Sequence, residues 1–191
     1  MNLYFDMEFT GLKKDTTIIS LGIVDQNGRN IYLEYTDYNE ADVDDWIREN
    51  VINNTLFLKN GDKEPKVIVE GKSTTVLGDT EYNRKVLKDW LSLYSKEDIQ
   101  FVSDVCHYDM VLLIDAIYGH GLKIPRNVSI DCHNINQDIA AYKRISVKDA
   151  ADVVRESIVA REIEGMEIQK HNSLFDAQVI RLIYNKINKL D

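Results

Sequence analysis

The chain begins with three short segments whose hydrophobic pattern is that of β-strands. Asn2–Phe5 is mainly apolar, Thr16–Val24 is rich in β-branched residues, and Asn30–Tyr35 alternates between apolar and polar side chains. Asn27-Gly28 lies between the second and third segments, and this dipeptide is a strong signal for a tight hairpin turn. The pattern therefore predicts three consecutive strands arranged as a meander.

The remainder of the chain is dominated by helical periodicity. Apolar side chains recur at helical spacing, which predicts helices over 42–51, 80–94, 109–118, 133–142, 147–160 and 172–188. Ile99–Ser103 is a short apolar segment and predicts a further strand. Strands followed mostly by helices indicate an α/β fold, in which helices flank a mixed β-sheet.

Residues 53–79 fit neither pattern clearly. Lys66–Gly71 and Thr74–Gly78 are strand-like, and Gly71-Lys72-Ser73 between them can form a turn. We therefore expect a β-hairpin insertion in this region. The whole chain, residues 1–191, has a length that fits one domain with a hydrophobic core.

Composition and charge argue against several classes of protein. No apolar run approaches the roughly 20 residues that span a bilayer, and no basic segment followed by an apolar one marks a signal peptide. We therefore expect a cytoplasmic protein without a membrane partner. Cys106 and Cys132 form no paired pattern of the kind found in zinc sites. The net charge of −9 argues against a broad basic surface that coats nucleic acid, but not against an enzyme that grips a few nucleotides at a metal site.

The first candidate for chemistry follows directly on the first predicted strand. Asp6 and Glu8 are two positions apart, so at the end of a strand their side chains point to the same face. Two neighbouring carboxylates repel each other, and a cation between them reverses that cost. Carboxylate oxygens at this spacing suit Mg²⁺ or Mn²⁺. Taken alone, the pair also fits two solvated acids at a strand end.

Two further stretches carry acids. Asp109 lies at the start of a predicted helix, where a carboxylate can also serve as a cap, and Asp104 is a nearby rival. His171 precedes the last predicted helix, and Asp176 lies near the entry of that helix. A histidine at that position can reach over the helix face that presents Asp176. The alternative is a loop histidine beside an ordinary helical acid.

Together, these stretches resemble the motifs of the DEDDh family of 3′-to-5′ exonucleases. That family carries Asp-x-Glu on its first strand, an Asp at the start of a middle helix, and a His followed by an Asp near the C-terminus. The matching residues here are Asp6, Glu8, Asp109, His171 and Asp176. The segment 6–12 is similar to the first motif of oligoribonucleases, and Trp46-Ile47-Arg48 is similar to a Trp-x-Arg helix in exoribonucleases of the RNase AS type. The segments 53–79 and much of 131–168 have no clear counterpart.

The resemblance implies a ribonuclease H-like fold and an active site with two metal ions. The ligands of two Mg²⁺ or Mn²⁺ ions would be Asp6, Glu8, Asp109 and Asp176. Asp6 would bridge both ions, Glu8 and Asp176 would hold the ion that activates water, and Asp109 would serve the other. His171 would accept the proton of the attacking water, a role that suits an imidazole titrating near neutral pH.

The residues around the first two motifs would bind the substrate. By the same resemblance, Thr10, Gly11 and Leu12 would hold the terminal nucleotide. Gly11 would let the backbone approach the ligand, while Phe9 and Tyr108 would supply aromatic contacts. For Phe9 and Leu12, a place in the hydrophobic core is equally compatible with the sequence.

The implied function is that of a metal-dependent exonuclease. It would release nucleoside monophosphates from the 3′-end of single-stranded nucleic acid, with RNA favoured over DNA, and a homodimer is compatible with the resemblance. One alternative is a DNA-directed 3′-to-5′ exonuclease. Others are a module of the same fold that binds nucleic acid without cutting it, and a metal-dependent phosphohydrolase that acts on small nucleotides.

Overall fold

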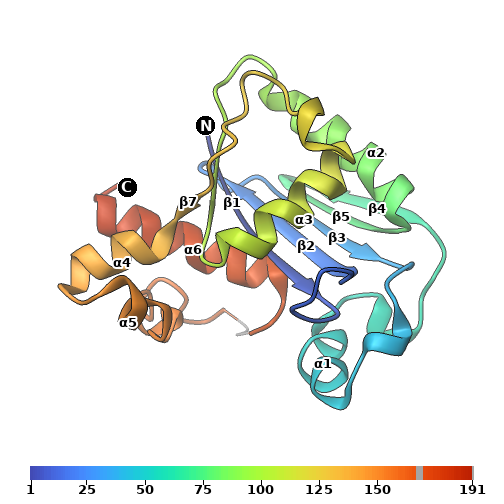
Figure 1. Cartoon of the computed structure of the whole chain (residues 1–191), viewed down its shortest axis with the longest axis horizontal. Coiled ribbons are helices and arrows are strands. Elements are labelled where there is room, and N and C mark those ends of the chain that lie inside the picture. Colours follow the sequence, from blue (N-terminus) through green and yellow to red (C-terminus); the bar gives the residue numbers. More distant parts are fainter. Residues whose placement is uncertain (167–169, 191) are drawn as a thin grey trace.

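The computed structural model describes residues 1–166 and 170–190, which form a mixed β-sheet flanked by helices (Figure 1). The strands are β1 (Asn2–Phe9), β2 (Ile18–Asp25), β3 (Asn30–Tyr35), β4 (Lys66–Glu70), β5 (Ser73–Gly78), β6 (Gln100–Ser103) and β7 (His133–Asn134). The α-helices are α1 (Asp45–Asn50), α2 (Thr80–Leu91), α3 (Cys106–Tyr118), α4 (Ile135–Lys143), α5 (Val147–Ala151) and α6 (Ser173–Asn188). This arrangement confirms the α/β fold class that the sequence predicts.

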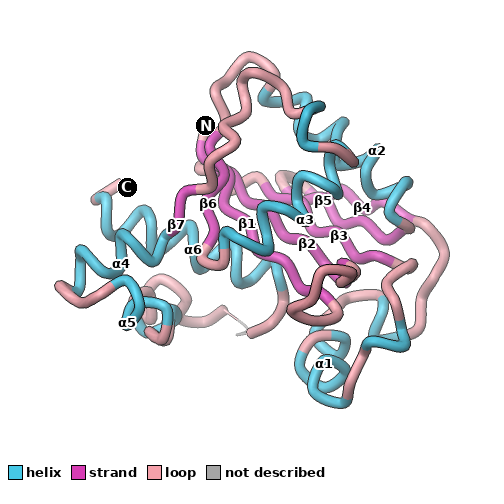
Figure 2. The backbone as a smooth tube through the Cα atoms, in the orientation of Figure 1, coloured by secondary structure: helices cyan, strands magenta, loops and turns pink. Residues whose placement is uncertain are grey.

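The strands form one sheet in the order β4-β5-β3-β2-β1-β6-β7, as Figure 2 shows. The strands β1, β2 and β3 pair antiparallel, which confirms the predicted meander. On one side of this meander β5 runs parallel to β3, and on the other side β6 runs parallel to β1. The first strand of the chain therefore lies inside the sheet, between β2 and β6.

Alternating side chains of β1 enter two separate hydrophobic cores. Leu3 and Phe5 pack with residues of α2 and α3 on one face of the sheet. Tyr4 belongs to the core on the opposite face, to which α4 and α6 contribute. In Figure 1, α3 passes across one face of the sheet and α6 across the other. Asp6 and Glu8 continue the alternation of Tyr4, so they lie on the α6 face.

Helix α6 lies directly on the backbone of β2. A Cβ atom at Gly22 would overlap with the backbone of Ser173 and Leu174, so no side chain fits between strand and helix at this point. At the same contact, the hydroxyl groups of Ser20 and Ser173 share a hydrogen bond of 3.0 Å. Because Gly22 pairs with Asp6 across the two strands, this contact places the start of α6 next to the acidic end of β1.

The segment 66–78 forms the β-hairpin that the sequence predicts. β4 and β5 pair antiparallel, and β5 extends the main sheet through its pairing with β3. β4 is thus an edge strand, and its apolar side chains Val67, Ile68 and Val69 are exposed. That the hairpin is an insertion, and that residues 1–191 form one domain, stay predictions. None of the helices in the described ranges is long and apolar enough to cross a membrane.

The helix predicted over 147–160 is wrong in its length. Helix α5 ends at Ala151, Val154 has extended backbone angles, and a short 3₁₀ turn follows at Arg155–Ser157. Ile158 lies beyond that turn in the core on the α6 face. The apolar periodicity thus reflects burial of separate short elements against α6 rather than one continuous helix.

Candidate active site

The strand β1 supplies the first two acids of the site. Its pairing with β2 places Asp6 opposite Gly22 and Glu8 opposite Ser20, and the register shifts at a bulge between Glu8 and Phe9. The strand is longer than predicted, so both acids lie within it rather than beyond its end. Their side chains line a cleft with a volume of about 440 Å³. The strand alternation alone therefore brings these two carboxylates into one cavity.

Asp109 enters the same cleft from the first turn of α3. Its side chain is buried and accepts a hydrogen bond of 2.8 Å from the Ser103 hydroxyl, at the end of β6. The helix dipole favours a carboxylate at this position. Because β6 runs parallel to β1, the loop from β6 into α3 begins beside the strand that carries Asp6.

The start of α6 supplies the third part of the site. Asn172 caps the helix, since its side chain accepts hydrogen bonds from the backbone of the first turn. His171 has a left-handed backbone with a φ angle of 63°, which is uncommon for a residue other than glycine. Its backbone N–H donates a hydrogen bond of 3.0 Å to Asp176 Oδ2. Its Nδ1 lies 3.7 Å from Glu8 Oε1, so the imidazole joins the acids of β1 and α6.

A short 3₁₀ segment after α1, Ile52–Asn54, holds the turn before α6 in place. The side chain of Asn54 donates a hydrogen bond of 2.8 Å to the backbone carbonyl of Lys170. In return, the side chain of Asn172 donates one of 2.9 Å to the backbone carbonyl of Asn54. The Trp46 ring lies edge-on to the imidazole of His171, with ring centroids 5.1 Å apart. The uncommon backbone conformation of His171 is therefore held by hydrogen bonds of the residues before and after it, Lys170 and Asn172.

The possible metal ligands fall into two groups. The first group is Glu8, His171 and Asp176, whose ligand atoms lie within 4.8 Å of one another. The second group is Asp6, Asp104 and Asp109, with the same spacing. The structure thus brings together all five residues of the sequence motif, although they come from both ends and the middle of the chain.

Burial raises the pKa of these acids and is the main cause in each case. It raises the pKa of Asp109 to about 8 and that of Asp176 to about 7. The pKa of Asp6 is raised well above its ordinary value, first by burial and then by the neighbouring charges of Asp176 and Asp109. Burial also raises the pKa of Glu8, while the contact with Glu8 raises the pKa of His171.

This set of donors fits hard divalent cations. Carboxylate oxygens dominate both groups, and such ligands suit Mg²⁺ and Mn²⁺. A cation in each group would offset the repulsion that now contributes to the raised pKa values. The residues therefore fit the type of metal expected from the sequence, while the identity and number of the ions stay predictions.

Phe9 and Leu12, two of the residues predicted to bind substrate, line this cleft, and Tyr108 contacts it through Phe9. Phe9 and Tyr108 stack, with ring centroids 6.1 Å apart and an angle of 24° between the ring planes. Phe9 is half-buried and packs against the core on the α3 face, but it also lines the cleft. Leu12 lines the cleft too and is 69% exposed, so its alternative place in the core is wrong. An exposed leucine beside an aromatic stack can contact a planar ligand.

Thr10 and Gly11 have different roles in the structure. The Thr10 side chain is buried, and its hydroxyl forms a hydrogen bond of 3.1 Å with the hydroxyl of Thr17. Contact of Thr10 with a substrate would therefore involve its backbone. Gly11 has a φ angle of 144°, which favours glycine, and no atom lies within 4 Å of the space that a Cβ would occupy. Substrate binding by these residues stays a prediction.

Asp104 and Arg155 are charged residues of the cleft that lie outside the sequence motif. The sequence offers Asp104 as an alternative to Asp109, and the structure places both in the same group of possible ligands. Arg155 also lines the cleft and forms an ion pair of 2.7 Å with Asp104. Its position inside a predicted helix gave no signal for this role, because the helix breaks just before it.

Comparison with known proteins identifies the fold. The sequence matches no protein-family model and no curated protein. A solved structure of a 3′-exonuclease that recognises the 3′-end of a histone mRNA stem-loop is similar, with a TM-score of 0.64 and 11% sequence identity over 98% of this chain and 81% of that chain. The catalytic unit of Neurospora crassa Pan2, with protease and nuclease domains, matches with a TM-score of 0.45 and 17% identity over 98% of this chain and 27% of that chain. The first likeness confirms the predicted ribonuclease H-like fold.

Proposed function

We propose that this protein is a metal-dependent 3′-to-5′ exonuclease that removes nucleoside monophosphates from single-stranded nucleic acid, with RNA favoured. One observation carries the proposal: acids from β1, α3 and α6 meet a histidine in a single cleft. Cleavage of a phosphodiester requires stabilisation of charge on phosphate oxygens more than it requires a protein nucleophile. Two groups of oxygen ligands with a histidine beside them suit that reaction.

The metal ions would be Mg²⁺ or Mn²⁺. Following the family resemblance, Asp6 would serve both ions, Glu8 and Asp176 would hold one, and Asp109 would serve the other. When bound, such ions lower the pKa of an attacking water and offset the charge on the leaving oxygen. The raised pKa values of these acids indicate that, without a cation, the site keeps part of its charge neutralised by protons.

His171 would act as the general base. Its imidazole would take the proton of the water that attacks the last phosphodiester, and the Glu8 carboxylate, 3.7 Å from Nδ1, would stabilise the imidazolium. The hydrogen bond from its backbone to Asp176 fixes the position from which the ring enters the cleft. Hydrolysis then yields a nucleoside monophosphate and a strand that is one nucleotide shorter and ends in a 3′-hydroxyl.

The substrate would be a single strand held by its 3′-end. Leu12 and the Phe9–Tyr108 stack would contact the terminal base, since aromatic and apolar platforms bind unpaired bases without regard to sequence. The net charge of −9 offers no broad basic surface for a duplex. RNA would be favoured through its 2′-hydroxyl, which the Glu8 side chain or the Thr10 backbone could contact. The 3′-exonuclease of similar fold recognises an mRNA 3′-end, which supports RNA as the substrate class.

The experiment is a degradation assay with matched RNA and DNA oligonucleotides labelled at the 3′-end. We expect release of labelled mononucleotide in Mg²⁺ or Mn²⁺, no release in chelator, and faster release from RNA. The same strands labelled at the 5′-end should shorten one nucleotide at a time. Equal or faster degradation of DNA would refute the RNA preference and favour the DNA-directed alternative.

Two outcomes would overturn the nuclease proposal itself. Tight binding of the strand without any release of label would indicate a binding module that does not cut. Hydrolysis of nucleoside polyphosphates with no attack on oligonucleotides would indicate a phosphohydrolase for small nucleotides. A strand blocked by a 3′-phosphate serves as a control, because an enzyme that grips a free 3′-end should degrade it more slowly.

A further inference from the structure

Asp104 lies in the loop from β6 to α3, directly beside the acids of the proposed active site. One of its carboxylate oxygens is within 4.8 Å of an oxygen of Asp6 and an oxygen of Asp109. Its side chain is only 10% exposed. A carboxylate this deeply buried needs a partner of opposite charge, and preferably one for each oxygen.

The two oxygens of Asp104 differ in what they contact. Oδ2 lies 2.7 Å from Nε of Arg155, in the 3₁₀ turn Arg155–Ser157 that follows α5. Oδ1 is fully buried and has no hydrogen-bond partner among the described residues. An unpaired buried carboxylate oxygen is costly, and a cation is the ligand that satisfies it best in a cleft lined by other acids.

Arg155 neutralises only part of the charge in this group. Asp6, Asp104 and Asp109 bring three carboxyl groups together, and Arg155 is the ion-pair partner of just one of them. When all three carboxyl groups are ionised, the group carries an excess of negative charge that a divalent cation would balance.

The position of Asp104 is fixed from the outside of the cleft. Asn136, in the first turn of α4, donates a hydrogen bond of 2.8 Å from its side chain to the backbone carbonyl of Asp104. Its side-chain oxygen accepts a long hydrogen bond of 3.5 Å from Nη2 of Arg155. Asp104, Arg155 and Asn136 thus form a closed network, in which Asn136 holds the backbone of Asp104 and Arg155 holds one of its carboxylate oxygens.

We propose that Asp104 is a further metal ligand, which completes one divalent-cation site together with Asp6 and Asp109, and that Arg155 is the residue that positions it. The inference deepens the proposed function and rests on its metal-binding part. It assigns a chemical role to a residue outside the sequence motif. It also explains why Arg155, in the 3₁₀ turn after α5, lines the cleft next to this group of acids.

The test is calorimetric titration of the purified protein with Mn²⁺, which reports binding without any substrate. In Asp104→Asn we expect the affinity of one Mn²⁺ site to fall by at least 10- to 100-fold. This factor is typical for removal of a residue that only supports a metal ligand, so loss of a ligand itself should cost no less. Asp152→Asn is the matched control, since Asp152 lines the same cleft but lies outside both ligand groups. It should reduce the affinity far less. Equal losses in both variants would mean that Asp104 contributes only general charge, and would overturn the proposal.

A second variant guards against loss of folding. Asp104→Asn leaves the Arg155 charge without its partner, so the double variant Asp104→Asn with Arg155→Met removes both charges together. The double variant should fold, and the affinity for Mn²⁺ at one of its two sites should be weak. Wild-type affinity at both sites in this variant would overturn the role of Asp104. Arg155→Met alone should weaken the same site by a smaller factor, and wild-type affinity there would overturn the positioning role of Arg155.

The outcome separates this inference from the proposed function. If the parent protein binds no Mn²⁺, the metal-dependent function fails, and the role of Asp104 fails with it. If the parent and Asp104→Asn bind Mn²⁺ alike while Asp109→Asn loses a site, only the role of Asp104 is wrong. These two results cannot be confused, because the first concerns the parent protein and the second a comparison between variants.

Discussion

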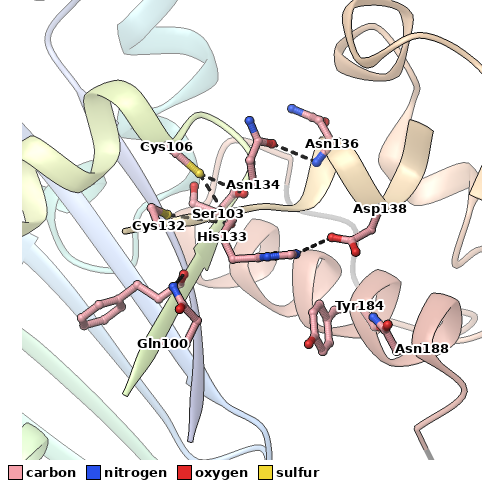
Figure 3. Close-up of polar contacts among 11 residues, drawn as sticks. Gln100, Ser103, Cys106, Cys132, His133, Asn134, Asn136, Asp138, Tyr184 and Asn188 are labelled. Carbon is pink, nitrogen blue, oxygen red and sulfur yellow. Dashed lines mark hydrogen bonds and ion pairs between the residues drawn. The ribbon is translucent and has the colours of Figure 1, made fainter. Parts of the chain in front are cut away.

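The molecule contains two contacts between a histidine and a carboxylate, and they lie in very different surroundings. His171 lies 3.7 Å from Glu8 in the cleft. His133, on β7, lies 2.5 Å from Asp138 in the first turn of α4, as Figure 3 shows. The two imidazoles are almost equally exposed, at 32% and 35% of their side-chain surface. Neither exposure nor the closeness of the carboxylate therefore distinguishes a candidate active site from the other pair.

The surroundings of the two histidines provide the distinction. His133 has the ring of Tyr184 edge-on at 5.8 Å, and its pair with Asp138 joins a strand end to the helix that follows it. Within the described ranges, the groups of three or more possible metal ligands contain His171 but not His133. A histidine beside one acid stabilises local structure; a histidine where several buried acids converge can take part in chemistry. The following experiments test this comparison.

The largest effect is expected when an acid of the cleft is neutralised. Asp6→Asn or Asp176→Asn should abolish exonuclease activity and weaken Mn²⁺ binding. The loss of turnover should exceed roughly 10⁴-fold, which is the upper end of what removal of a general base costs. The physical reason is the removal of a metal ligand. Turnover is measured with 3′-labelled RNA in saturating Mg²⁺, and the fold is checked by circular dichroism. Near-parent turnover in either variant would contradict the two-metal assignment.

Loss of the cleft imidazole should have the next largest effect. His171→Ala should reduce turnover by about 10²- to 10⁴-fold, because a general base contributes roughly that much. In the parent the rate should rise with pH as His171 loses its proton, and this dependence should disappear in the variant. Its matched control is His133→Ala, which removes an imidazole of similar exposure and should leave turnover unchanged.

The same pair of variants can also contradict the assignment. Equal turnover in His171→Ala and the parent would make His171 a loop residue like any other. Loss of Mn²⁺ binding in His171→Ala would instead make it a metal ligand, as its place in a ligand group with Glu8 and Asp176 allows. The attacking water would then need another base.

A smaller effect concerns the stability of the metal-free protein. Burial raises the pKa of Asp176 to about 7 and that of Asp109 to about 8, well above the ordinary value for an aspartate. The folded chain therefore keeps protons that the unfolded chain releases, so in chelator the free energy of unfolding should fall as pH rises from about 4 to 8. Each such proton contributes up to about 1.4 kcal/mol per pH unit. Asp109→Asn should flatten the dependence, as measured by urea unfolding; stability that rises with pH would contradict the raised pKa values.

The smallest effect is expected at the second histidine pair. Asp138→Asn should lower the free energy of unfolding by about 0.3–1 kcal/mol, the contribution of a partly exposed ion pair or of a helix N-terminal acid. Exonuclease turnover should not change, because the pair lies outside both ligand groups of the cleft. Thermal unfolding and the oligonucleotide assay check the two parts. A loss of turnover would show that this pair acts on the cleft, and the comparison would fail.

Local signals predicted much of the fold. The strand Asn30–Tyr35 begins and ends as predicted, since its alternation and the Asn-Gly turn before it are both local features. The first helix after the hairpin is correct in place but has Asp79 rather than Thr80 as its cap. Both residue types cap helices well, so the sequence could not decide between neighbours. Strand ends, turns and helix caps that depend on one or two adjacent residues are therefore predictable from the sequence.

The features that sequence could not predict depend on contacts between distant segments. The break after α5 follows from the fit of Ile158 against α6, and no glycine or proline marks it. The sequence presents Asp104 and Asp109 as alternatives, because one precedes and the other begins the same helix, whereas the fold places both next to Asp6. Arg155 forms an ion pair with Asp104, although it lies 51 residues later in the chain. Such pairings are set by the sheet, not by local periodicity.

The contact between Gly22 and the first turn of α6 has a consequence for how this chain can change over generations. Any side chain at Gly22 would push the helix away from β2, and Asp176, in that same first turn, would move with it. Asp6 and Glu8 would stay where they are, because the sheet holds them. A mutation at a residue that touches no substrate could thus abolish catalysis and leave the fold intact. Descendants that keep this architecture for binding alone could arise by a single codon change at Gly22, with every acid still in the sequence.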